Sequence, residues 1–123
     1  MFRILSIVAA FIFAPHMASA DAVWANYSFI VKPGAEAKLE KALRGYFDGN
    51  AAFTGKVFFN RQVMNGADPS THNIAILQPS VSAWEEGVAS SQSDPKFQAL
   101  AQLFAQNAQS VGESLLTLSL IHI

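Results

Sequence analysis

Cysteine is absent from the 123-residue chain, and charged residues make up only 14% of it. The absence of cysteine excludes a disulfide framework and a thiolate metal site, so packing must stabilise the fold. The eight basic and nine acidic residues form no basic cluster, which argues against nucleic-acid binding. After residue 20, every apolar run is far shorter than the roughly 20 residues that a membrane-spanning helix needs.

The first twenty residues have the pattern of a secretory signal peptide. Arg3 provides a positive start, residues 4–14 are almost entirely apolar, and Ala-Ser-Ala at residues 18–20 suits signal peptidase. We therefore expect a leader over residues 1–20 and a periplasmic or secreted protein. Residues 21–123 then form a single domain with a net charge near −2, because Arg3 leaves with the leader.

Residue patterns predict the elements of the first part of this domain. Residues 23–31 are rich in β-branched and aromatic side chains, which is typical of a strand. Pro33-Gly34 then turns the chain into a helix over residues 35–48, where apolar residues recur at helical spacing. Strands over residues 56–64 and 71–78 follow, and a loop rich in turn-forming residues joins them into an antiparallel hairpin.

The last part of the domain predicts two helical segments and a strand. Ser82 and Glu85 form a capping box at the start of the first segment. Pro95 begins the second segment, and Gly112 ends it. Residues 115–123 form the closing strand. The order β-α-β-β-α-β predicts an α+β, ferredoxin-like fold, with a four-stranded antiparallel sheet and its helices on one face.

The other face of this sheet is left uncovered, and it carries the candidate ligand-binding residues. Alternation places Trp24, Asn26 and Ser28 on that face of the first strand, with Phe58, Asn60 and Gln62 on the same face of the second. Two copies packed face to face would cover it, which predicts a homodimer with an enclosed cavity. Aromatic rings beside amides suit a planar, mostly apolar organic ligand. The alternative is a polar subunit interface.

Three local patterns resemble the dimeric α/β-barrel superfamily. They are the strand that ends in Lys32-Pro33-Gly34, the Trp84 helix that follows Gln78-Pro79-Ser80, and the break Ser93-Asp94-Pro95-Lys96-Phe97. That superfamily includes antibiotic-biosynthesis-type monooxygenases, haem-degrading monooxygenases and stress-responsive barrel proteins. The resemblance implies a homodimer and a cofactor-independent oxygenase activity.

The resemblance also implies roles for single residues. Haem-degrading members carry an asparagine on the first strand, and Asn26 occupies a similar place. Its amide would polarise the substrate or dioxygen, and His72 would act as a reserve base. The same members have a tryptophan where this chain has Gln78, and a histidine ligand where residues 99–102 read Ala-Leu-Ala-Gln. We therefore expect no haem, no other cofactor and no metal.

Two hypotheses of different classes follow from the sequence. In the first, the protein holds a small apolar organic molecule and oxidises it. In the second, it is a binding or assembly module that uses the uncovered sheet face for protein association, since fold does not determine function. Convergence of Asn26, Asn60 and His72 on one enclosed cavity would favour the first hypothesis.

Overall fold

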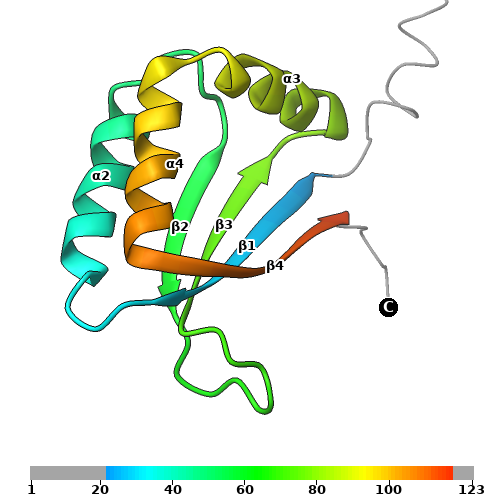
Figure 1. Cartoon of the computed structure of the whole chain (residues 1–123). Coiled ribbons are helices and arrows are strands. Elements are labelled where there is room, and N and C mark those ends of the chain that lie inside the picture. Colours follow the sequence, from blue (N-terminus) through cyan, green and yellow to red (C-terminus); the bar gives the residue numbers. More distant parts are fainter. Residues whose placement is uncertain (1–21, 118–123) are drawn as a thin grey trace, which may run out of the picture.

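A computed structural model provides the structure of the protein and describes residues 22–117 (Figure 1). The leader predicted over residues 1–20 and the end of the strand predicted over residues 115–123 lie outside the described residues. The elements follow in the order β1 (Val23–Val31), α2 (Glu36–Asp48), β2 (Lys56–Arg61), β3 (His72–Gln78), α3 (Val81–Gln92), α4 (Pro95–Asn107) and β4 (Ala108–Thr117).

The four described strands form one antiparallel sheet in the order β2-β3-β1-β4. Helices α2 and α4 lie side by side over one face of this sheet, and α3 lies at the end of the sheet where β3 finishes (Figure 1). We call the sheet face covered by α2 and α4 the helix face, and the opposite face of the sheet the open face. The arrangement confirms the predicted α+β fold, including the break of the second helical region into α3 and α4.

The core lies between the helix face and the two long helices. Leu39 and Leu43 of α2 meet Leu100 and Phe104 of α4 over Ile74 of β3, and all five are buried. Alternating residues of β1 and β2 complete it from the sheet, namely Tyr27, Phe29, Val31, Val57 and Phe59. The predicted alternation of both strands is therefore confirmed.

Local sequence explains where the helices begin. Gly34 has a φ of +82°, a conformation that favours glycine, and it turns the chain from β1 toward α2. Asp94 caps α4 by accepting a hydrogen bond from Lys96 N at 2.9 Å, with Pro95 as the first helical residue. The cap of α3 is Ser80, whose Oγ accepts from Ala83 N at 3.1 Å. The prediction of a capping box at Ser82 was therefore wrong by two residues.

Strand β2 ends at Arg61, three residues before the predicted end. The pattern continues apolar through Val63 and Met64, but their side chains are 90% and 93% exposed. These two side chains therefore gain no burial that would extend the sheet. Asn65 instead organises the following loop, because its Nδ2 donates to Ser70 O at 2.9 Å.

Strand β4 begins at Ala108, seven residues before the predicted start. Residues as far as Val111 fit the apolar stripe of α4, so the prediction that Gly112 ends this helix was wrong. The chain instead pairs with β1 from Val31 opposite Ala108 to Val23 opposite Thr117, which satisfies the backbone of both strands. Gly112 lies within β4 opposite Ser28, and the helix ends at Asn107.

Candidate ligand-binding cavity

A cavity of about 1070 Å³ lies on the helix face, between the sheet and the helices. Sites for small organic ligands are typically of about 300–1,000 Å³ and lined mostly by apolar side chains. Eight aromatic side chains line this cavity, namely Tyr27, Phe29, Tyr46, Phe47, Phe53, Trp84, Phe97 and Phe104.

Tyr46 is at the centre of this aromatic wall. Its ring centroid lies 4.8 Å from that of Phe47 and 5.8 Å from that of Phe97, both with edge-on geometry. The ring of Phe47 lies 4.8 Å from Phe53 in turn. The Tyr46 hydroxyl donates to Asp94 Oδ2 at 3.2 Å. Burial first, and then the nearby Asp94 carboxylate, raise the pKa of Tyr46, so its hydroxyl stays protonated near neutral pH.

Two buried polar atoms at the cavity have no hydrogen-bond partner among the described residues. One is Oε1 of Gln78, a residue only 4% exposed at the end of β3. The other is the indole Nε1 of Trp84, in the first turns of α3. A buried polar group without a partner typically costs about 1–3 kcal/mol. Neighbouring protein atoms cover both of them almost completely.

Close packing of Gly55 confines the Gln78 side chain from one side. A Cβ atom added at Gly55 would lie 2.4 Å from Leu77 O and 3.0 Å from Gln78 Cδ. Only glycine therefore lets the chain before β2 approach the end of β3 so closely. On the other side, a Cβ at Gly87 of α3 would lie 3.6 Å from Gln78 Nε2, an ordinary contact distance.

The open face carries a row of amides across three strands. Asn60 Nδ2 of β2 donates to Asn73 Oδ1 of β3 at 2.9 Å, and Asn73 Nδ2 donates to Asn26 Oδ1 of β1 at 3.0 Å. Trp24 and Phe58 lie beside this row with ring centroids 5.6 Å apart. The structure thus brings together Trp24, Asn26, Phe58 and Asn60, and alternation puts Ser28 on the same face.

None of the six predicted ligand-binding and catalytic residues associated with the open face lines the helix-face cavity. Gln62 lies beyond the end of β2, where its backbone N donates to Thr71 O at 2.8 Å. Binding of a ligand by Trp24, Ser28, Phe58, Asn60 and Gln62, and a catalytic role for Asn26, stay predictions.

His72 lies on the helix face, away from Asn26 and Asn60. Neighbouring residues of a strand point to opposite faces, so the place of Asn73 in the amide row turns His72 toward the helices. The convergence of His72 with the two asparagines, which would have favoured the first hypothesis, is therefore not found. His72 is 8% exposed, stacks on Phe59 at 5.2 Å, and does not line the cavity. A role for it as a base is untested.

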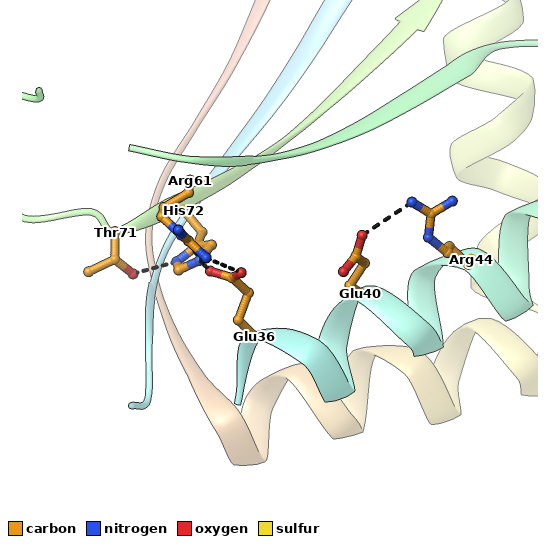
Figure 2. A network of polar contacts seen from close by, with 6 residues as sticks. All are labelled: Glu36, Glu40, Arg44, Arg61, Thr71 and His72. Atoms are coloured by element: carbon orange, nitrogen blue, oxygen red, sulfur yellow. Dashed lines mark hydrogen bonds and ion pairs between the residues drawn. The ribbon is translucent and has the colours of Figure 1, made fainter. Parts of the chain in front are cut away.

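Instead, His72 joins a polar network that ties α2 to the sheet (Figure 2). Its Nε2 lies 2.5 Å from Glu36 Oε2, and its Nδ1 lies 2.9 Å from Thr71 Oγ1. Arg61 at the end of β2 donates to both carboxylate oxygens of Glu36. These hydrogen bonds, from Arg61 first and then His72, lower the pKa of Glu36 from 4.5 to about 2.

Sequence reasoning did not single out Gln78 or Trp84 as residues that line a cavity. Gln78 is in phase with Ile74 and Ile76 on the buried face of β3. A glutamine at an inward position of a strand, directly before a proline, was the available signal. Over residues 22–117, no three His, Asp or Glu side chains gather as a metal site would require. No helix in that span is long and apolar enough to cross a bilayer.

Comparison with known proteins finds similar proteins by structure alone. No family model and none of the curated proteins matches the chain. SnoaB, a cofactor-independent oxygenase from Streptomyces nogalater, is 18% identical in sequence and superposes with a TM-score of 0.60. The match covers 83% of this chain and 97% of the SnoaB chain. A dimeric protein of unknown function and ferredoxin-like fold from Bacteroides fragilis is 10% identical with a TM-score of 0.55, over 79% and 96%. A dimeric ferredoxin-like protein of unknown function from Thermobifida fusca is 10% identical with a TM-score of 0.56, over 82% and 92%.

The fold is ferredoxin-like. These likenesses confirm the predicted fold, and they confirm the resemblance to antibiotic-biosynthesis-monooxygenase-like proteins at the level of the fold. In this ferredoxin-like chain the two sheet faces differ in kind. The helix face holds an aromatic cavity with unpaired polar atoms, and the open face holds a row of paired amides.

Proposed function

We propose that the protein binds a small, largely apolar aromatic molecule in the cavity on its helix face. The observation that carries this proposal is the aromatic lining of a 1070 Å³ cavity. Aromatic side chains bind planar ligands by stacking and edge-on contacts while excluding water. The oxygenase activity of SnoaB, which shares the fold, supports a ligand-binding role without deciding the chemistry.

Native mass spectrometry of the purified protein tests this proposal. A bound mass that leaves on collisional activation is expected, and its loss in Phe104→Ala would assign it to the cavity. Trp24→Phe, which changes an aromatic residue on the open face, serves as the matched control and should retain the mass. Retention in Phe104→Ala and loss in Trp24→Phe would contradict a site on the helix face.

The activity we propose is cofactor-independent oxygenation of an electron-rich ring. With 1,5-dihydroxynaphthalene as the probe, one atom of O₂ becomes a ring carbonyl and the other leaves as water. The product is 5-hydroxy-1,4-naphthoquinone, and the substrate supplies all the electrons. The protein would position the ring and exclude water. Stoichiometric oxygen uptake with quinone formation supports the proposal, and binding without uptake supports a binding module.

A catalytic role for Asn26 or His72 is tested in the same assay. Loss of turnover in Asn26→Ala or His72→Ala, with binding of the probe intact, would support that role. Neither residue lines the cavity. Unchanged turnover would therefore limit Asn26 to the amide row of the open face and His72 to the network with Glu36.

We also propose that two copies associate through their open faces. Phe58 and Leu116 are 42% and 54% exposed on this face, and the proteins from Bacteroides fragilis and Thermobifida fusca are dimeric. Phe58→Glu should give a folded monomer by light scattering, since a buried unpaired charge opposes association. Val81→Glu, at a similarly exposed position of α3 (37%), should leave the dimer intact. A dimeric Phe58→Glu protein would exclude this interface.

The second candidate function is an assembly module that uses the same open face. The exposed Phe58 and Leu116 favour it. It predicts that native mass spectrometry finds a dimer or larger assembly without a bound small molecule.

We also propose that the protein is exported and that its leader is removed. Protein recovered from the periplasm should have the intact mass of a chain that begins at Asp21. A mass that includes residues 1–20 would contradict cleavage of the leader.

A further inference from the structure

We infer that the helix-face cavity selects organic cations, and that its ligand is an aromatic molecule carrying an ammonium group. This inference rests on the proposed function and specifies the charge of the ligand. The charged residues that line the cavity carry it. Glu86 and Glu113 are both acidic, and no Lys, Arg or His lies among the described residues of the lining. The cavity therefore combines aromatic rings with negative charge only.

The aromatic lining is one half of a site for an organic cation. Eight aromatic side chains line the cavity, and the face of an aromatic ring has a negative electrostatic potential that attracts an ammonium group. The Tyr46 hydroxyl donates to Asp94 Oδ2 at 3.2 Å. This hydrogen bond polarises the phenol and places a third carboxylate beside the aromatic wall.

The sheet supplies one of the two carboxylates of the lining. Glu113 of β4 lies directly opposite Tyr27 of β1, and residues opposite one another in an antiparallel pair share a face of the sheet. Tyr27 packs against the core on the helix face, so Glu113 points to the same face. Glu113 is exposed, which leaves its carboxylate accessible to a molecule in the cavity. A ring and a carboxylate thus lie side by side on the sheet.

Helix α3 supplies the other carboxylate. Glu86 lines the cavity two residues after Trp84 and is exposed. The neighbouring Glu85 is also exposed but does not line the cavity. Walls that carry one sign of charge concentrate ligands of the opposite sign and disfavour ligands of the same sign. Glu86 and Glu113 therefore favour a cation over a neutral or anionic molecule with the same ring.

The cation that fits this lining is organic. A metal ion needs several ligands gathered together, and over residues 22–117 no three His, Asp or Glu side chains gather in that way. An ammonium group is held instead by ring faces with a carboxylate nearby. An aromatic amine would contact the rings with its apolar part and the carboxylates with its charge.

Calorimetry with three indoles tests the inference on the purified protein. Tryptamine carries an ammonium group, 3-ethylindole is neutral, and indole-3-propionate is an anion with the same ring. We expect tryptamine to bind at least about fivefold more tightly than 3-ethylindole, since a cation–π contact and an exposed ion pair together contribute roughly that factor. Indole-3-propionate should bind more weakly than 3-ethylindole. High salt should narrow the difference between the two charged probes.

Two conservative variants assign the preference to the cavity. Glu113→Gln and Glu86→Gln keep the side-chain volume and remove the charge. Each should weaken tryptamine about threefold and strengthen indole-3-propionate, while 3-ethylindole is unaffected. Glu85→Gln removes the same charge at the adjacent position of α3 outside the lining, and should leave all three affinities nearly unchanged. It is the matched control for net charge.

The outcomes separate this inference from the proposed function. Equal affinities for tryptamine and 3-ethylindole would overturn the inference and leave an apolar aromatic site. An equal loss of tryptamine affinity in Glu85→Gln and in both lining variants would also overturn it, because net charge would then attract the amine. Failure of all three probes to bind would overturn the proposed function and the inference with it. The Tm of each variant should match that of the wild-type protein, since all three positions are exposed.

Discussion

The two faces of the sheet use the same functional group, the side-chain amide, in opposite ways. On the open face, the amides of Asn60, Asn73 and Asn26 bond to one another across three strands. On the helix face, the Gln78 amide lies among aromatic side chains and its oxygen has no partner among the described residues. Paired amides stabilise the fold they belong to, whereas a buried amide oxygen without a partner costs stability.

The largest difference between the faces should be in packing. Leu39 is fully buried on the helix face (0% exposed), whereas Leu116 is 54% exposed on the open face. Leu39→Ala should lower the free energy of unfolding by about 2–5 kcal/mol, measured by urea denaturation. Leu116→Ala should cost less than about 1 kcal/mol in dilute protein. If two copies associate through the open face, the destabilisation caused by Leu116→Ala should grow with protein concentration, whereas that caused by Leu39→Ala should not.

The packing around Gln78 gives the next largest effect. A Cβ at Gly55 would lie 2.4 Å from the backbone oxygen of Leu77, so Gly55→Ala should destabilise the protein by about 1–3 kcal/mol. Gly87→Ala, on the other side of the same amide, meets only ordinary contacts and should gain up to about 1 kcal/mol from helix propensity. Equal effects of the two substitutions would mean that Gly55 does not confine Gln78.

The two kinds of amide should respond to substitution with opposite signs. Gln78→Met should raise the free energy of unfolding of the unliganded protein by about 1 kcal/mol, because an unpaired buried acceptor is removed. Asn73→Ala should lower it by about 1 kcal/mol, because two hydrogen bonds on the open face are lost. Thermal denaturation compares the variants directly. A destabilised Gln78→Met protein would show that the oxygen is satisfied in solution.

The smallest predicted effect concerns the network of Glu36 at the sheet edge. Its pKa is lowered from 4.5 to about 2 in the folded protein, so the unfolded chain binds more protons between these values. The network therefore stabilises the fold fully above about pH 4.5 and loses this effect as the pH falls toward 2. Glu36→Gln should flatten that part of the stability profile, and high salt should reduce the difference because the Glu36 and Arg61 side chains are open to solvent. A profile identical to that of the wild-type protein would contradict the assignment.

The sequence carried enough information to predict the fold, because strand alternation and helical spacing match the buried faces. Where it misled, two patterns competed for the same residues. Ala108 and Val111 fit a helical stripe, but pairing with β1 satisfies more of the backbone. Val63 and Met64 continued an apolar run that tertiary structure leaves exposed.

The site was harder to predict than the fold. Alternation correctly grouped Trp24, Asn26, Phe58 and Asn60 on one face, but it does not indicate where helices leave space. The cavity depends on how α2, α3 and α4 are placed relative to the sheet, which no local pattern encodes. Gln78 was visible only as a polar residue at an inward position of β3.

Two tryptophans, one on each face, allow the central claim to be measured directly. Trp84 lines the cavity and Trp24 lies on the open face, and the chain contains no other tryptophan. A ¹H–¹⁵N NMR titration with 1,5-dihydroxynaphthalene follows both indole N–H signals, assigned with Trp84→Phe and Trp24→Phe. We predict that the Trp84 signal shifts with saturation while the Trp24 signal stays in place. Movement of the Trp24 signal alone would place the ligand on the open face and contradict this account.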